Sequence, residues 1–156
     1  MINPLKKNEM PTLSPDIRNK NFEEVALGYT LQQALDEASR CLNCKTKPCV
    51  NGCPVSINIP KFIDYIKQSK FKEAYSVICE SSSLSAVCGR VCPQENQCEK
   101  YCVRGIKGES VAIGRLERFV SDNFSFDPDV KIVRNNIKVA IVGSGPSGLA
   151  CAGELA

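Results

Sequence analysis

Cysteine is the residue type in this chain whose number and spacing best suit chemistry. Eight of the ten cysteines in the 156 residues form two short runs: Cys41, Cys44, Cys49 and Cys53, then Cys88, Cys92, Cys98 and Cys102. Thiolates this close in sequence can converge on one metal centre without the entropic cost of closing a long loop. By number alone, eight thiolates supply two metal sites of four ligands each.

The proline that follows Cys53 and Cys92 favours iron–sulfur clusters over zinc. In the bacterial run C-x2-C-x2-C-x3-C-P, three cysteines hold one cluster and the cysteine before the proline holds another. The first run here ends in the same way but has two more residues between its second and third cysteines, so the match is an analogy. A structural zinc module with two four-cysteine sites is the alternative, although it explains neither Cys-Pro pair.

Composition and charge indicate the cellular compartment of the protein and the classes of partner that it binds. The N-terminal residues lack the apolar segment of a secretory signal peptide, and no apolar run approaches the roughly 20 residues needed to span a membrane. We therefore expect a cytoplasmic protein without a membrane partner, in which clustered cysteines serve metal or redox chemistry rather than disulfides. The net charge of +3 is too small to indicate a nucleic-acid partner.

Helical patterns surround both cysteine runs. Residues 1–20 are expected to form an extended arm, and residues 21–124 a helical domain. Thr30 and Gln33 fit a capping box, so a helix should end where Cys41 and Cys44 begin. Further helices are predicted near 60–66, at 71–79 and at 110–124, with loops around metal at 45–58 and 88–108. Cys79 extends the apolar face of its helix and is expected to be buried without a metal.

The end of the chain has a different pattern. After a predicted linker at 125–136, residues 137–142 have a strand pattern and lead through Gly143, Gly145 and Gly148 into a helix. Strand, G-x-G-x-x-G and helix together are typical of a dinucleotide-binding turn. The complete unit needs about 30 residues, with an acidic residue about 20 positions further on. We therefore expect residues 137–156 to be the truncated first βα unit of a Rossmann-type domain, binding neither FAD nor NADPH alone. Its strand should be disordered, fold back, or pair with another copy in a homodimer.

Several motifs together resemble one protein family. They are Arg40-Cys-Leu-Asn-Cys44, Cys53-Pro-Val, Cys88-Gly-Arg-Val-Cys92-Pro and Val111-Ala-Ile-Gly-Arg-Leu-Glu-Arg-Phe119. They resemble the small (β) subunit of NADPH-dependent glutamate synthase and the N-terminal domain of dihydropyrimidine dehydrogenase. The resemblance implies an all-α, alpha-helical ferredoxin-like domain with two [4Fe–4S] clusters, preceding folds for FAD and NADPH. In the complete subunit, electrons would pass from NADPH through FAD and clusters to the glutamate synthase large subunit or another redox subunit.

The resemblance also implies a ligand set that differs from the simple count of cysteines. It assigns one cluster to Cys41, Cys44, Cys49 and Cys102, and the other to Cys53, Cys92, Cys98 and the carboxylate of Glu117. Counting alone would use Cys88 in place of Glu117, and the alternative interpretation of Glu117 is an ordinary exposed residue flanked by Arg115 and Arg118. We follow the resemblance, because Leu116-Glu117-Arg118-Phe119 fits the ligand segment of the family and Glu117 borders the apolar face of its helix. Two other hypotheses remain open: the zinc module, and a subunit-docking module without redox activity.

Overall fold

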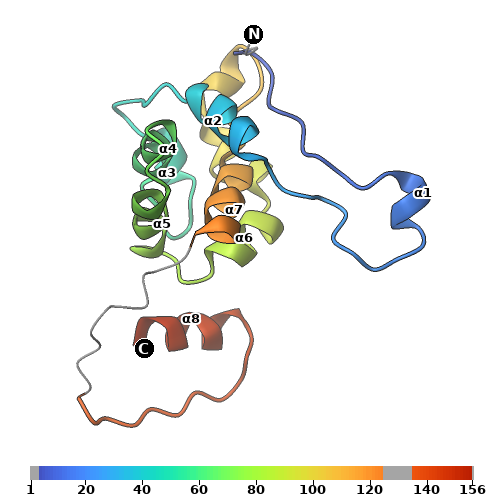
Figure 1. The fold of residues 1–156 in the computed structure, drawn as a ribbon. Helices are drawn as coiled ribbons and strands as arrows, with labels where there is room; N and C mark the ends of the chain where they lie inside the picture. The colour runs from blue at the N-terminus through green and yellow to red at the C-terminus, as the bar shows by residue number, and fades with distance from the viewer. Residues whose placement is uncertain (1–3, 125–134, 156) are drawn as a thin grey trace.

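The computed structural model describes residues 4–124 and 135–155 (Figure 1). All regular elements in these residues are helical, so the prediction of an all-α domain is confirmed. Most of the predicted linker, residues 125–134, lies outside the described residues. The elements are α1 Pro15–Arg18, α2 Leu31–Ser39, α3 Pro48–Asn51, α4 Ile59–Lys67, α5 Phe71–Cys79, α6 Ser85–Val91, the 3-10 turns η1 Gln94–Asn96, η2 Glu99–Tyr101 and η3 Val103–Ile106, α7 Ile113–Asn123 and α8 Pro146–Leu155.

Local sequence explains where several helices begin. The Thr30 side chain accepts a hydrogen bond from the Gln33 amide, and the Thr30 amide donates to the Gln33 side chain, so the predicted capping box is confirmed. Pro60 lies in the first turn of α4, where its missing N–H costs no helical bond. The helix predicted at 71–79 has those bounds, whereas α7 begins at Ile113 rather than near residue 110.

The regions predicted as loops around metal are more ordered than expected. Residues 45–58 include α3, and residues 88–108 include the end of α6 and three 3-10 turns. Cys88 in particular lies inside α6 rather than in a loop. The loop prediction rested on proline and glycine, which also suit short helices and tight turns.

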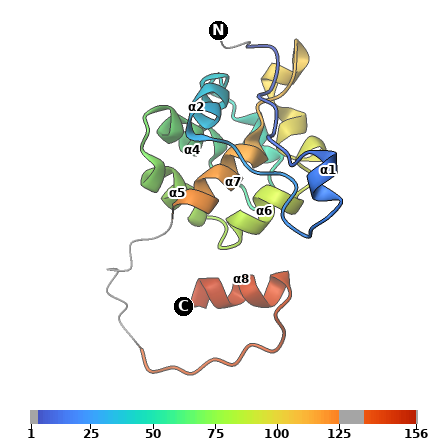
Figure 2. The same cartoon turned by 45° about the vertical axis from the view of Figure 1, so that its right-hand side comes forward.

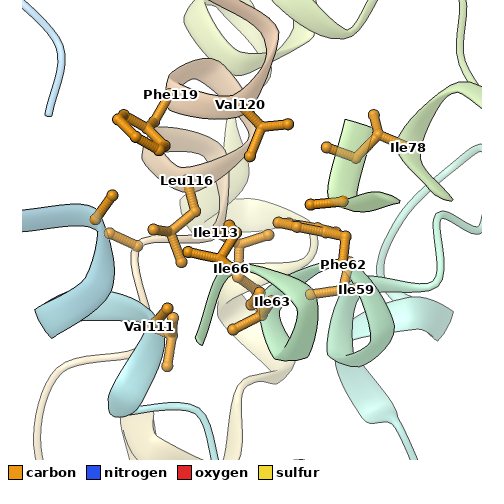
Figure 3. Close-up of a cluster of buried hydrophobic side chains, with 14 of the residues drawn as sticks. Ile59, Phe62, Ile63, Ile66, Ile78, Val111, Ile113, Leu116, Phe119 and Val120 are labelled. Atoms are coloured by element: carbon orange, nitrogen blue, oxygen red, sulfur yellow. The ribbon is translucent and has the colours of Figure 1, made fainter. Parts of the chain in front are cut away.

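The hydrophobic core lies between α4, α5 and α7 (Figure 3). Phe62, Ile63 and Ile66 of α4 are at most 1% exposed and face Leu116 and Val120 of α7. The core is closed at one end by three aromatic rings: Phe71 stacks on Phe124 at 4.8 Å between ring centroids and meets Phe119 edge-on at 5.8 Å. Both views show α7 running through the middle of the bundle, with α6 along its side (Figures 1 and 2).

The N-terminal arm packs on the helical domain. Thr12 and Ala26 form an antiparallel bridge, and the amide of Leu27 donates to the carbonyl of Pro11 at 2.8 Å. Further along the arm, the backbone carbonyl of Asn8 accepts hydrogen bonds from Tyr29 and from Arg115 of α7. The arm is therefore held by backbone pairing and by side chains of the bundle.

Residues 137–142 have a strand pattern that was expected to lack a partner in this chain, and residues 135–145 form neither strand nor helix. A strand needs a neighbour for its N–H and C=O groups, and the described residues offer none here. Ile137 and Val142 are accordingly 73% and 99% exposed. The helix that follows does form, as α8, but none of its residues is buried.

Gly143 begins the turn that precedes α8. Its φ of +107° lies in the region that side chains disfavour, and a Cβ on Gly148 would lie only 2.2 Å from the Gly143 carbonyl oxygen. The glycines thus allow a tight turn, as their spacing predicted.

No helix in the described residues has the length and apolar character needed to cross a lipid bilayer.

Candidate metal centres

The first cysteine run is wound tightly by three residues with left-handed backbone conformation. Asn43, Lys47 and Ser56 have φ values of 49°, 45° and 56°. Such values are uncommon for residues other than glycine. The winding follows α2 directly, because the amide of Cys41 still donates to the carbonyl of Ala38 at 3.0 Å. The end of α2 thereby fixes where the run begins.

Four thiols line one cavity in the domain, and three of them come from this run. Cys41, Cys44 and Cys49 are joined there by the remote Cys102, which lies between η2 and η3. The cavity contains about 380 Å³ of space free of protein atoms, part of it open to solvent. Apolar side chains of α4 and α7 complete the wall, with Ile59, Ile63 and Ile113 among them. We call these four cysteines the first cysteine site.

The thiols of the first cysteine site are partly buried and lie near one another. Burial, followed by the neighbouring Cys41 and Cys102, raises the pKa of Cys49 to about 11. Burial is also the main cause that raises the pKa of Cys41, and Cys102 contributes to it. The backbone amide of Val111 points at the same group and donates to Cys102 Sγ at 3.5 Å. Several groups that would bind or stabilise a metal centre therefore converge here.

A second set of ionisable side chains converges near the C-terminal end of α6. Burial first, then the neighbouring Cys88, Glu117 and Cys53, raises the pKa of Cys92 to about 11. Burial, Glu99, Cys53 and Glu117 together raise the pKa of Cys98 to about 12. We call Cys53, Cys92, Cys98 and Glu117 the second cysteine site. Its members come from the loop after α3, the end of α6, the start of η2 and the middle of α7.

Glu117 is the residue of this group whose environment is least expected. Its side chain is only 7% exposed, and its Oε1 atom is buried without any hydrogen-bond partner. Burial raises the pKa of this carboxyl group to about 7. The arginines beside it in sequence donate elsewhere: Arg115 to the carbonyl of Asn8, and Arg118 to the carbonyl of Ala26 and to Asp122. A buried carboxylate left in this way is costly unless a cation or donor reaches it.

Cys88 also lies beside the second cysteine site. It is one turn before Cys92 on α6, and its sulfur lies 4.0 Å from Ser82 Oγ. Both Cys88 and Glu117 are therefore near enough to Cys92 to influence its pKa. The geometry alone leaves the eighth ligand open, as the sequence did.

All ten cysteines lie in the residues that the structure describes. All ten are free thiols, so none forms a disulfide. Among the described residues, no three Cys, Asp or Glu side chains are close enough together to hold a single metal ion. Cys79 is partly buried at the end of α5, and Cys151 is exposed on α8.

A buried ion pair beside the first cysteine site was missed from the sequence. Glu37 and Arg40 pair at the end of α2 and are 0% and 1% exposed. Two charged residues three positions apart on a helix usually indicate an exposed pair, so no pattern predicted burial. Only the position of Arg40 next to Cys41 could have drawn attention to it.

The chain was compared with protein-family models and with characterised proteins. The model for dihydropyrimidine dehydrogenase domain II, 4Fe-4S cluster, matches residues 18–127. The chain belongs to this family. It thus carries a 4Fe–4S domain of the kind found in oxidoreductases, as the resemblance implied.

Relatives agree with the family assignment. The chain is 41% identical to the NAD-dependent dihydropyrimidine dehydrogenase subunit PreT of Escherichia coli strain K12, over 82% of this chain and 32% of PreT. It is 36% identical to the glutamate synthase [NADPH] small chain of the same organism, over 97% of this chain and 33% of the relative. A second such small chain, from Halomonas elongata, is 37% identical over 86% of this chain and 29% of its own length. The chain thus spans about a third of the length of these relatives.

Proposed function

We propose that this chain is an electron-transfer module that holds two [4Fe–4S] clusters. Cys41, Cys44, Cys49 and Cys102 would bind one cluster at the first cysteine site. At the second cysteine site, Cys53, Cys92 and Cys98 would bind the other together with the carboxylate of Glu117. The family match supports 4Fe–4S binding, and the rest of the proposal rests on how these side chains are grouped.

The observation that carries the proposal is the buried, unpartnered Oε1 of Glu117, which lies near enough to Cys92 and Cys98 to raise the pKa of both thiols. A carboxyl oxygen out of reach of water and of protein donors is rare in folded proteins. Iron would satisfy it, since a carboxylate is an oxygen ligand that carries negative charge. The four-thiol cavity is the corresponding feature of the first site, and its apolar wall suits a group that must be shielded from water.

A bound [4Fe–4S] cluster would supply one-electron redox chemistry. The chain's own residues would set its environment. Apolar side chains of α4 and α7 line the first site, and the Val111 amide donates to a ligand sulfur. Lys67 holds the backbone at the first ligand by donating to the carbonyl of Cys41 at 2.7 Å.

The larger context that we propose is an NADPH-dependent, glutamate synthase-type flavoprotein small subunit. Relatives named as glutamate synthase small chains and as a dihydropyrimidine dehydrogenase subunit support this context. In a longer protein, Gly143, Gly145 and Gly148 would bind the pyrophosphate of FAD at the N-terminus of α8. Electrons from NADPH would then pass through FAD and the clusters to a partner, either a glutamate synthase large subunit or another redox subunit.

Iron and acid-labile sulfide analysis of anaerobically purified protein tests the proposal. We expect about eight iron and eight sulfide per chain, because each of two clusters contains four of each. About four of each would mean that one site is not a cluster site. Stoichiometric zinc without sulfide would favour the structural zinc module, and neither metal nor sulfide would favour a docking module without redox activity.

A further inference from the structure

The buried pair Glu37–Arg40 contacts the backbone of residues 109–112 at successive positions. Arg40 donates from Nη2 to the carbonyl of Glu109 at 2.5 Å and from Nη1 to that of Ser110 at 3.1 Å. Glu37 accepts a hydrogen bond from the amide of Ala112 at 2.8 Å through the same Oε1 atom that pairs with Arg40. The two side chains therefore fix the peptide groups on both sides of Val111.

Val111 itself is held between these contacts, and its amide is the one that donates to Cys102 Sγ. Val111 is 2% exposed, so its peptide cannot turn to water. The orientation of this N–H toward the sulfur follows from the carbonyl of Ser110, which belongs to the same peptide group as the Val111 amide. Because Arg40 binds that carbonyl, it also sets the direction of the N–H on the opposite side of the peptide plane.

The pair is in turn fixed from the N-terminal arm. The backbone amide and the side-chain amide of Asn8 donate to Glu37 Oε2 at 2.7 and 3.1 Å. Arg40 Nε also points to the carbonyl of Pro4 at 3.4 Å. Both oxygens of Glu37 are thus satisfied, which is what a buried ion pair needs in order to hold one geometry.

We propose that Glu37 and Arg40 are positioning residues for the first cysteine site, and that they tune the reduction potential of its cluster through the Val111 amide. The inference rests on the proposed function, since it concerns the cluster at Cys41, Cys44, Cys49 and Cys102. Hydrogen bonds to ligand sulfurs are among the features that set cluster potentials. A donor stabilises the extra negative charge of the reduced cluster, so a weaker Val111 N–H···Sγ bond lowers the potential.

Two substitutions that conserve charge test this role. Arg40→Lys keeps the positive charge but loses the planar fork that reaches two carbonyls and Glu37 together. Glu37→Asp keeps the negative charge but withdraws the carboxylate by one methylene group. Because no charge is lost, a change in potential reports geometry. The matched control is Lys61→Arg, which keeps the charge and alters the exposed pair between Lys61 and Glu80.

The measurement is an anaerobic redox titration of the full 156-residue chain with dithionite as the electron donor, followed by electron paramagnetic resonance. We expect two reduction steps in the wild-type chain. Either of the variants Arg40→Lys and Glu37→Asp should lower the potential of one step, with iron content unchanged, while Lys61→Arg should change neither step. The affected step should be the one that Cys41→Ser also alters, and not the one that Glu117→Ala alters.

A second measurement on the wild-type chain does not depend on variants that fold. Exchange into D2O should replace a proton coupled to the reduced cluster of the first site, as detected by electron–nuclear double resonance. In a variant that folds, this coupling should weaken. Unchanged potentials and coupling in folded variants with full iron would overturn the positioning role and leave the proposed function intact. A wild-type chain without clusters would overturn both.

Discussion

Gly89 of α6 lies against the backbone of Arg118 in α7: a Cβ at position 89 would come within 2.8 Å of Arg118 Cα. No side chain can fit at that distance, so the glycine sets how closely the two helices approach. α6 ends at Cys92, and α7 carries Glu117 next to Arg118. The contact therefore fixes the spacing between two members of the second cysteine site.

Gly89→Ala should accordingly destabilise the domain and disturb the second cysteine site. Overpacking of this kind costs about 1–3 kcal/mol in the free energy of unfolding, which anaerobic guanidinium denaturation would measure. Iron content should fall toward four per chain if the second cluster is lost first. Gly105→Ala is the control, because a Cβ there would meet the Cβ and the backbone nitrogen of Ser110 at ordinary distances of 3.8 and 3.9 Å. Equal stability of the two variants would contradict the role of Gly89.

Substitutions at Glu117 and Cys88 distinguish the two candidates for the eighth ligand. Glu117→Ala should remove or alter one cluster only, because it deletes the unpartnered carboxylate. Cys88→Ala should leave both, since that thiol already contacts Ser82. The measurements are iron content and the electron paramagnetic resonance spectrum of the reduced protein. Four iron lost in Cys88→Ala and none in Glu117→Ala would reverse the assignment.

Breaking the Glu37–Arg40 pair should be far more damaging than breaking an exposed pair. Arg40→Met leaves the buried carboxylate of Glu37 without its cation, and such changes cost about 3–5 kcal/mol of stability. Lys61→Met is the matched control, because Lys61 and Glu80 are 45% and 60% exposed at 3.8 Å, where a pair contributes about 0–1 kcal/mol. Chemical denaturation of both variants gives the comparison. Similar losses of stability in the two variants would show that the burial of the Glu37–Arg40 pair has no energetic consequence.

The chain should bind neither FAD nor NADPH at micromolar concentrations. Residues 135–145 form no strand and α8 is exposed throughout, so the glycine turn lacks the sheet that would support a dinucleotide. Titration of FAD with detection of flavin fluorescence checks this expectation. Stoichiometric quenching would show that the glycine turn and α8 suffice for binding.

The sequence by itself determined the helical character, the metal class and the family. Capping and apolar spacing are local properties, so α2 and α5 followed from a few neighbouring residues each. The Cys-Pro pairs and the motifs around them were equally local, and the family match agrees with them. Residues 137–142 have a strand pattern but form no strand, for the corresponding reason: a strand depends on partners distant in sequence, whereas the helix α8 satisfies its own backbone.

The tertiary structure decided which side chains meet. Cys102 and Cys41 line the same cavity although more than half of the domain's sequence separates them. They meet because the turns η2 and η3 lie beside the end of α2. The resemblance implied that grouping, but no spacing in the chain predicts it. Burial was likewise decided by the tertiary structure: the resemblance implied that Glu117 is a ligand but left an exposed glutamate as the alternative, and no pattern predicted the buried pair of Glu37 and Arg40. Glu117 is buried on α7, which runs through the middle of the bundle (Figure 2). The Glu37–Arg40 pair lies at the end of α2, where the backbone of residues 109–112 and the N-terminal arm supply its hydrogen bonds.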